Sequence, residues 1–284
     1  MHGAWLEPGT RLDFRYERID QDQPMSGSRK VGVGEIPRHH DEVFTHNRNY
    51  VTTLDHTING DWGVSLVLPY VYREHFHIHN HMGAQEEERW NFNDLGDARV
   101  MARRRLASFD STAPSLGTLG LTFGLKLPTG QVNVVNDDGE RAERSLQPGS
   151  GTTDLLLGLF YSSLRPTKSL SSFIQAQAQL PLNAHEDYRP GNRLSLDTGV
   201  RYALGESWGA LLQANLLWRG RDRGLQAEPE DTGGTSLFLS PGVSLGVGKS
   251  LQAYGFFQVP LYQYVNGVQL TARKAFTIGA NLRF

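Results

Sequence analysis

Apolar and polar residues alternate one by one along most of this chain. In residues 117–128 every second position is apolar, while Thr, Gly or Lys lies between. Residues 62–73, 193–204 and 207–219 repeat the pattern, which is the period of a β-strand with one apolar and one polar face. The helical period of 3.6 residues is nearly absent. The pattern therefore predicts an all-β protein.

About twelve segments of this kind follow one another, and most are ten to fourteen residues long, about twice the usual length of a globular strand. A tilted strand that crosses a hydrocarbon core needs about 9–11 residues. The segments are residues 10–19, 46–58, 62–73, 94–106, 117–128, 153–163, 170–181, 193–204, 207–219, 235–248, 250–262 and 271–284.

Long and short connections alternate between the segments. The long ones are residues 20–45, 74–93, 129–152, 182–192, 220–234 and 263–270. Several short ones, such as Asn59-Gly60-Asp61 and Gly205-Glu206, carry the turn chemistry of tight hairpins. An even number of strands with one short and one long rim is the topology of an outer-membrane barrel, with both chain ends at the short rim.

A soluble β-sandwich or lipocalin-like barrel is the alternative, because it too alternates apolar and polar faces. The aromatic residues decide between them, because they concentrate near segment ends, as in the two girdles of a membrane barrel. Examples are Trp62, Tyr70, Trp218 and Phe284. We expect an antiparallel up-and-down transmembrane β-barrel of about 12 strands, with short periplasmic turns and long extracellular loops. Residues 10–284 form this single domain, after a short periplasmic segment at residues 1–9.

Composition narrows the class further. The net charge is −2, with 28 Lys+Arg against 30 Asp+Glu, which does not favour nucleic acid as a partner. No eighteen consecutive residues are apolar, so no helical membrane span is expected. There is no cysteine, which excludes disulfides and thiolate chemistry. The first residues lack the pattern of a secretion signal, so we expect a bacterial outer-membrane protein whose signal peptide has been removed.

Three stretches carry a family resemblance. They are Leu95-Gly96-Asp97-Ala98-Arg99, the stretch from Gly124 to Gly130 (GLKLPTG) and the stretch from Leu146 to Asp154 (LQPGSGTTD), followed by a terminal Phe284. From about residue 46 onward the chain resembles the outer-membrane transporter family named after the meta-pathway of phenol degradation. The resemblance implies a Gram-negative outer-membrane barrel that passes small molecules, with a terminal aromatic read by the barrel-assembly machinery. The family name does not imply that phenol is a solute of this chain.

If the apolar face meets lipid, the other face lines a lumen in which basic residues outnumber acidic ones. Fixed positive charge along a pore favours anions. The predicted pore-lining residues are Asp97, Arg99, Arg103, Arg105, Lys126, Gln175, Gln177, Arg193, Arg201 and Arg219. Arg273 is assigned to the same face. A narrow barrel closed by paired charges remains the alternative, since twelve strands lie between filled and open barrels.

Histidines gather in the predicted long loops. His75, His77, His79 and His81 are two residues apart, so in an extended strand all four would point to one side. Imidazoles suit Zn²⁺, Cu²⁺ or Ni²⁺, and we expect His39 and His40 to join the same site. A pH-sensitive gate and a merely solvated loop remain open. No cofactor is required.

Two common catalytic patterns are missing. The chain contains no H-x-S or H-E-x-x-H, and only Asp55 and Thr57 beside His56 weakly suggest acid–base chemistry. We therefore expect a monomeric channel for passive passage of small solutes, and no enzyme. A closed or metal-binding barrel that holds a periplasmic or surface protein partner is the second interpretation, and a lipid-modifying enzyme is the third. The remaining partners are the lipid bilayer and the small-molecule solute.

Overall fold

The computed structural model describes residues 8–38, 40–81, 84–109, 116–165, 169–248 and 250–284. Apart from one 3-10 turn at Pro229–Asp231 (η2), its regular elements are β-strands. The strands are β1 (Gly9–Gly27), β2 (Arg29–Lys30), β3 (His40–Thr57), β4 (Trp62–His81), β5 (Ala84–Leu95), β6 (Arg99–Phe109), β7 (Leu116–Lys126), β8 (Asp154–Arg165), β9 (Leu170–Pro181), β10 (Arg193–Ala203), β11 (Trp208–Arg219), β12 (Gly234–Val247) and β13 (Leu251–Arg283).

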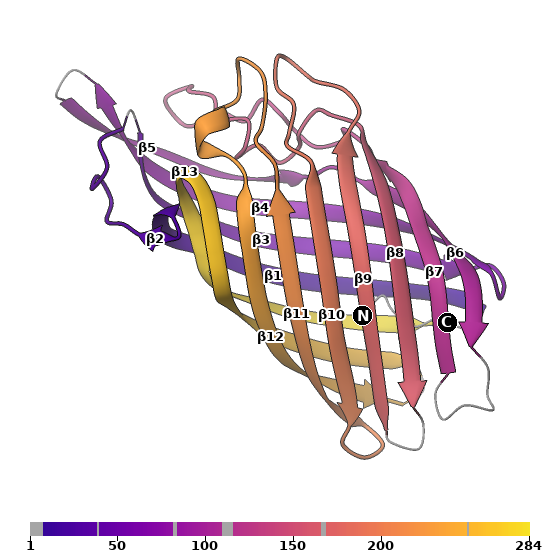
Figure 1. Ribbon diagram of the computed structural model, residues 1–284. Coiled ribbons are helices and arrows are strands. Elements are labelled where there is room, and N and C mark those ends of the chain that lie inside the picture. The colour runs from indigo at the N-terminus through magenta and orange to yellow at the C-terminus, as the bar shows by residue number, and fades with distance from the viewer. Residues whose placement is uncertain (1–7, 39, 82–83, 110–115, 166–168, 249) are drawn as a thin grey trace.

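The strands form an antiparallel sheet that closes on itself (Figure 1). Within the described residues, the closed ring contains eleven elements, while β2 and β5 pair with it from outside the ring. The element β13 pairs with β12 through its first half and with β1 through its second half. Because Arg283 N donates to Ser250 O, the two halves of β13 lie side by side, and the wall has twelve strand segments. The predicted barrel of about twelve strands is confirmed.

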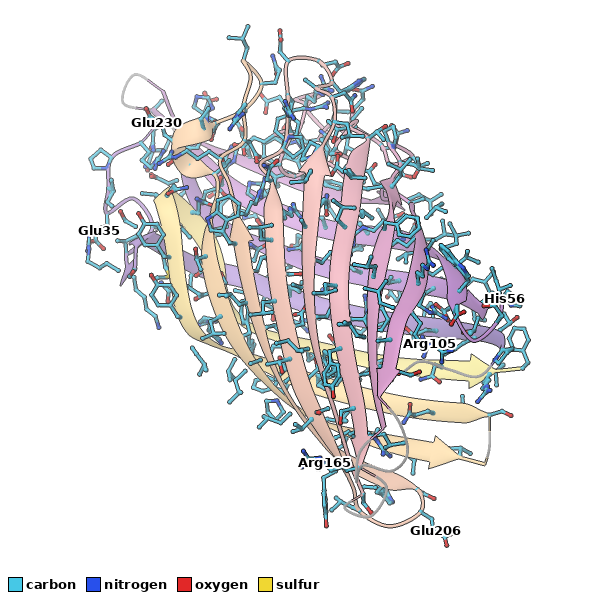
Figure 2. The ribbon with its side chains drawn as sticks, turned by 45° about the vertical axis from the view of Figure 1, so that its right-hand side comes forward. Glu35, His56, Arg105, Arg165, Glu206 and Glu230 are labelled. Carbon is cyan, nitrogen blue, oxygen red and sulfur yellow. The ribbon has the colours of Figure 1, made fainter. Side chains whose placement is uncertain are left out.

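The two ends of the barrel differ in their connections. Figure 2 shows Arg165 at the end of β8 and Glu206 in a short turn at one end of the barrel, and Glu35 and Glu230 on the long connections at the opposite end. The chain ends meet in the wall, where Thr10 N donates to Phe284 O at 3.1 Å. No helix in the described part of the chain is long and apolar enough to cross a membrane.

Alternation places apolar side chains outside and polar ones inside. On β10, Leu194 and Val200 are exposed on the outer face, whereas Arg193, Ser195 and Asp197 point inward. The outer face of β4 is apolar or aromatic from Trp62 through Tyr72. The residues of β4 beyond Tyr72 therefore extend past the lipid-facing band.

Several predicted boundaries are wrong. The predicted loop 263–270 is strand, because it lies within β13. The predicted strand 94–106 is broken at residues 96–98, between β5 and β6. Residues 74–93, expected to be a loop, continue β4 and form β5. The first part of β4, up to Val67, pairs with β6, and the remainder, from Tyr70, pairs with β5. Strand β1 runs to Gly27 and strand β3 begins at His40, so both extend into the predicted loop 20–45. Residues 1–7 of the predicted N-terminal segment lie outside the described residues.

Candidate functional site

Residues 129–152 fold into the mouth of the barrel, and we call them the inward loop. Arg73 on the inner face of β4 donates through Nη1 to the carbonyl of Leu146 in this loop. The same guanidinium donates through Nε to Asn47 Oδ1 on β3, at 2.7 Å. An Arg side chain that is fixed by one strand and bonded to the loop holds the loop against the inner wall.

Apolar packing supports the inward loop on one side. Trp90 and Phe92 of β5 and Ala142 of the loop form a buried cluster, joined by Val134 and Leu146. Trp90 Nε1 also donates to the carbonyl of Glu140 at 3.1 Å, so its ring both packs against the loop and bonds it. Hence β5, which lies outside the closed ring, covers the loop.

The two ends of the inward loop meet at a buried ion cluster, the Lys126 anchor. Lys126 Nζ lies 2.9 Å from Asp97 Oδ2 and 3.2 Å from Asp154 Oδ2. Asp97 accepts backbone N–H bonds from Gly130 and Ser150, which belong to the beginning and the end of the loop. The three stretches that carried the family resemblance thus converge on one network of paired charges.

Two glycines make that convergence possible. The backbones of Gly130 and Gly149 touch, because a Cβ placed on Gly130 would lie 2.7 Å from Gly149 Cα. Real Cβ atoms do not approach a backbone this closely, so any other residue at position 130 forces the loop ends apart.

A cavity of about 860 Å³, which we call the vestibule, lies between the inward loop and the connections at residues 182–192 and 220–234. Its walls include Gln21 of β1, Arg73 of β4 and Arg219 of β11, so it extends across the barrel interior. A space of this size accommodates a small-molecule solute.

Positive charge is concentrated beside the vestibule in an arc of four side chains. Arg193 lies directly opposite Arg219 in the strand register, and Arg99 lies directly opposite Lys126. Arg193 is also within electrostatic reach of Arg99, which links the two pairs across the barrel. Lys126 and Arg219 have carboxylate partners, the latter in Asp222 at 2.5 Å. Within the described part of the chain, Arg99 and Arg193 form no ion pair.

The other predicted pore-lining residues occupy varied surroundings. Arg103 is bound by Asp55, and Arg105 lies near the short turns, 3.0 Å from Asp61. Arg201 donates to Ser244. Gln175 and Gln177 share the inner face of β9 with Gln179, which bonds Asp154. Arg273 is wrongly assigned to the lumen: its side chain is 58% exposed and pairs with Asp22 beyond irregularities in the β1 register.

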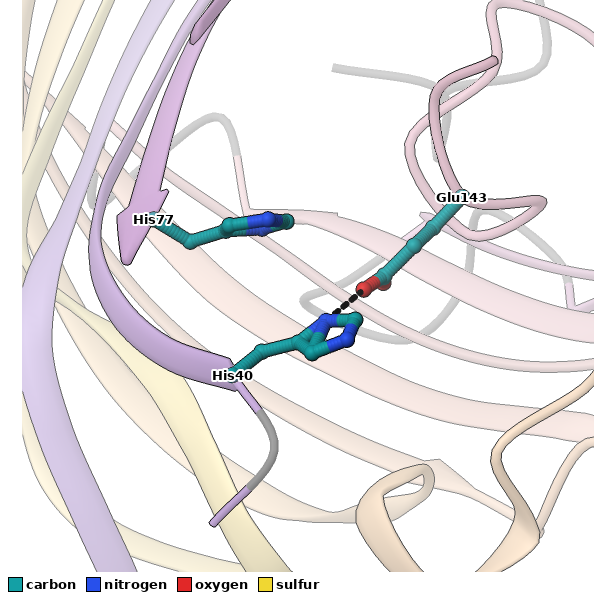
Figure 3. Close-up of side chains that lie close together, drawn as sticks. All are labelled: His40, His77 and Glu143. Atoms are coloured by element: carbon teal, nitrogen blue, oxygen red, sulfur yellow. Dashed lines mark ion pairs between the residues drawn. The ribbon is translucent and has the colours of Figure 1, made fainter. Parts of the chain in front are cut away.

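A second cluster, the histidine pocket, lies where β3 and β4 extend above the lipid-facing band. It consists of His40 and Glu42 on β3, His75 and His77 on β4, and Glu143 from the inward loop. Figure 3 shows His40 and His77 on the wall and Glu143 reaching toward them from the loop, with Oε1 of Glu143 3.5 Å from Nδ1 of His40. His75 and His77 are each only 1% exposed. They are therefore not the exposed loop histidines that the sequence suggested.

Short contacts orient the two buried imidazoles. Nε2 of His75 lies 3.2 Å from Nδ1 of His77 and 3.6 Å from Oε2 of Glu42. The opposite ring nitrogens are also bonded, His75 Nδ1 to Thr45 Oγ1 at 2.8 Å and His77 Nε2 to Glu88 Oε2 at 2.7 Å. Both rings are thus held in place from two sides.

Burial keeps both imidazoles neutral. Burial, together with the nearby His77 and Arg73, lowers the pKa of His75 to about 3. Burial also lowers the pKa of His77, although Glu88 partly offsets this effect. Neutral imidazoles carry a lone pair, which is the form that binds metal ions.

The carboxyl groups of the pocket are shifted in the opposite direction. Burial, together with the neighbouring Glu228, raises the pKa of Glu143 to about 7. Burial raises the pKa of Glu42 as well, with contributions from Glu143 and Glu228. Each of these carboxyls is destabilised as an anion, because it is desolvated beside other carboxyls.

The remaining predicted ligands lie apart from this pocket or cannot be placed. His79 contacts Glu88 at 3.2 Å and stacks on His40, at the edge of the pocket. His39 and the side chain of His81 lie outside the described residues. No sequence signal pointed to Thr45, Glu42 or Glu143, because their positions depend on strand register and on the inward fold of the loop.

The weak acid–base suggestion at His56 is not assembled. His56 is exposed on the outer face and bonds Thr10, whereas Asp55 points inward to Arg103. Adjacent residues of a strand point to opposite faces, so these two side chains cannot act on one substrate.

Comparisons with known proteins agree with the fold. The barrel superimposes on the crystal structure of the COG4313 outer membrane channel from Pseudomonas putida F1 with a TM-score of 0.70, at 12% identity, covering 100% of this chain and 98% of that one. It superimposes on the NanC porin with a TM-score of 0.51, at 13% identity, covering 96% and 100% of the two chains. No curated protein matches the sequence.

Residues 38–272 match the family described as "Putative MetA-pathway of phenol degradation". This range includes the Lys126 anchor, the inward loop and the histidine pocket. Of the two superimposed structures, one is described as an outer-membrane channel and the other as a porin, and neither as an enzyme. The chain therefore belongs to this family and has the fold of an outer-membrane β-barrel.

Proposed function

We propose that the protein is a bacterial outer-membrane channel through which small polar solutes diffuse, with a preference for anions. The observation that carries the proposal is the arc of Arg99, Lys126, Arg193 and Arg219 beside the vestibule. Like charges directly opposite one another destabilise a sheet, so this arrangement lowers the stability of the barrel wall.

The preference follows from the balance of charge. Three carboxylates pair with or lie beside the arc, those of Asp97, Asp154 and Asp222, while Glu17, which also lies near Arg99, is paired with Arg15. The guanidiniums of Arg99 and Arg193 therefore face the interior uncompensated by an ion pair within the described residues. A solute carboxylate or phosphate that enters the vestibule would meet these groups, because fixed positive charge raises the local concentration of anions.

Planar-bilayer recordings test the proposal. The refolded protein should give steady conductance, and its reversal potential in a KCl gradient should show chloride preference. A unit charge about 7 Å from the ion path in water contributes about 0.6 kcal/mol, or roughly threefold in anion occupancy. Arg193→Gln and Arg99→Gln should each reduce the chloride preference by about that factor.

Arg104→Gln is the matched control. Arg104 lies on the outer face of β6, over the ring of Trp62, so its loss should leave selectivity unchanged. Conductance without anion preference, or equal effects of all three variants, would remove the role of the arc. A folded barrel without conductance would instead favour the closed barrel that holds a periplasmic or surface partner.

Assembly is a separate part of the proposal. Phe284 ends the closing strand and is exposed on the outside of the barrel. A terminal aromatic in this position is accessible to the barrel-assembly machinery, and Phe284→Ala should lower the yield of folded protein in the outer membrane without altering refolding in detergent.

A further inference from the structure

We infer that Glu42, His75 and His77 bind one divalent transition-metal ion, of the class represented by Zn²⁺, in the wall of the vestibule. The inference is independent of conduction, since it rests on the local geometry of β3 and β4. It also changes the expected ligands, because the sequence pointed to a row of histidines along one strand rather than to two histidines and a carboxylate from two strands.

The separations of the ligand atoms fit a tetrahedral ion. Nε2 of His75 is 3.2 Å from Nδ1 of His77 and 3.6 Å from Oε2 of Glu42, and all three atoms lie within 4.8 Å of one another. Zinc bonds of about 2.0–2.1 Å at tetrahedral angles place neighbouring ligand atoms about 3.3–3.5 Å apart. Small side-chain rotations therefore complete the site without movement of the strands.

The surrounding hydrogen bonds direct the required lone pairs. Glu88 accepts from Nε2 of His77, which leaves Nδ1 as the unprotonated nitrogen. A carboxylate behind a metal-binding histidine is the usual arrangement at zinc sites. Thr45 Oγ1 can accept a hydrogen bond from the Nδ1–H of His75, which leaves Nε2 of this neutral ring unprotonated and available to the ion.

The carboxylates of the pocket also favour binding of a cation. Carboxylates border both buried imidazoles: Glu42 Oε2 lies 3.6 Å from His75 Nε2, and Glu88 Oε2 lies 2.7 Å from His77 Nε2. Arg38 is near Glu42 but forms an ion pair with Asp231. Buried carboxylates are costly unless a positive charge balances them, and a divalent ion would supply that charge.

The fourth coordination position faces the inward loop. His40 and Glu143 form a second group with His77, again with their ligand atoms within 4.8 Å of one another. Glu42, His40 and Glu143 all line the vestibule, so an ion can enter from this cavity. A bound ion would thus connect β3, β4 and the inward loop at one point (Figure 3).

Zinc titration of the untagged, refolded full chain in detergent tests the site. We expect one equivalent of Zn²⁺ to bind with a micromolar or lower dissociation constant, by calorimetry and by metal analysis after desalting. Glu42→Gln and His75→Ala should weaken binding by more than about 100-fold, because each removes one of three ligands. Thr45→Val keeps the side-chain shape and should weaken binding by about 10–100-fold.

His46→Ala and His185→Ala are the matched controls. Both remove an imidazole outside the pocket, beside Glu74 and Glu186 respectively, and both should bind Zn²⁺ as the unchanged protein does. Glu42→Gln retains the volume of the side chain, so it separates loss of a ligand from loss of the fold, which circular dichroism monitors.

Cobalt spectroscopy supplies a second readout. Co²⁺ in the same site should give the strong visible absorption of tetrahedral coordination, displaced by one equivalent of Zn²⁺ and absent in Glu42→Gln. The inference is overturned if the unchanged protein binds no stoichiometric Zn²⁺, or if the His46→Ala control loses as much affinity as Glu42→Gln. Loss of binding in Glu143→Gln but not in Glu42→Gln would also overturn the assigned ligands.

Discussion

Two of the contacts between the inward loop and the barrel wall differ in how charge is balanced. At the Lys126 anchor, an ammonium group lies between the carboxylates of Asp97 and Asp154, so the cation is part of the chain. In the histidine pocket, Glu42 and Glu143 lie beside neutral imidazoles. The first contact is complete by itself, whereas the second is suited to a cation from solution.

This difference assigns different roles to the two contacts. The anchor fixes the beginning and the end of the loop, because Asp97 accepts from both Gly130 and Ser150. The pocket touches only the tip of the loop, through Glu143. A change at the anchor should therefore affect the whole fold, and a change in the pocket should affect mainly ligand binding.

The largest effect is expected for Lys126→Met. The substitution leaves two buried carboxylates without their cation, and breaking a buried ion pair in this way costs about 3–5 kcal/mol. Denaturant unfolding in detergent, followed by tryptophan fluorescence, measures the free energy of unfolding. Lys274→Met, at an exposed position of β13, should change it by less than about 0.5 kcal/mol.

Removing all three charged groups of the anchor tests whether charge causes this loss of stability. Adding Asp97→Asn and Asp154→Asn to Lys126→Met removes the uncompensated carboxylates, so most of the lost stability should return. In Asp97→Asn the new amide oxygen can still accept a backbone N–H from the loop. A triple variant no more stable than the single one would show that lost packing, rather than charge, caused the effect.

A smaller effect is expected in the pocket. Free Zn²⁺ at about 100 times its dissociation constant should raise the free energy of unfolding by about 2.7 kcal/mol. The increase should vanish in Glu42→Gln and on addition of a chelator, and it should persist in His46→Ala. An equal increase in Glu42→Gln would place the stabilising ion elsewhere.

The sequence predicted one of these two contacts better than the other. Strict alternation along 117–128 and 153–163 places Lys126 and Asp154 on the same face, and the register pairs them directly. The break at residues 96–98, which brings Asp97 to them, was not predicted, because the apolar pattern runs through it. Alternation therefore placed Lys126 and Asp154 on one face, but the ion cluster itself was not predicted, because it depends on the register and on this local bend.

The pocket could not be predicted in the same way. Alternation placed His75, His77 and His79 on one face, but Glu42 reaches them only because the register sets it opposite His77 beside an irregularity in β3. Such shifts exchange the inner and outer faces of a strand, and they also explain the wrong assignment of Arg273. The position of Glu143 depends on the inward fold of a loop, which carries no periodic signal.

Gly130→Ala tests how closely the loop ends must approach. An added Cβ would lie 2.7 Å from Gly149 Cα and 2.9 Å from its nitrogen, so the backbones must separate at a cost of about 1–3 kcal/mol. The control is Gly246→Ala, whose Cβ would meet Ser207 O at 3.6 Å. Equal stability of the two variants would mean that the loop ends separate freely, and that the anchor tolerates movement.

The smallest effect is expected for Trp90→Phe, which weakens the contact between β5 and the inward loop. The ring loses its hydrogen bond to Glu140 O and part of its packing against Ala142, worth about 1 kcal/mol. Local opening of the loop should then be about fivefold more frequent, and trypsin cleavage after Arg141 should accelerate by that factor. Trp62→Phe, on the outer face, should leave cleavage unchanged. If Trp90→Phe accelerates cleavage while Zn²⁺ affinity stays the same, Glu42, His75 and His77 hold the ion without the loop; a parallel loss of affinity would make Glu143 the fourth ligand.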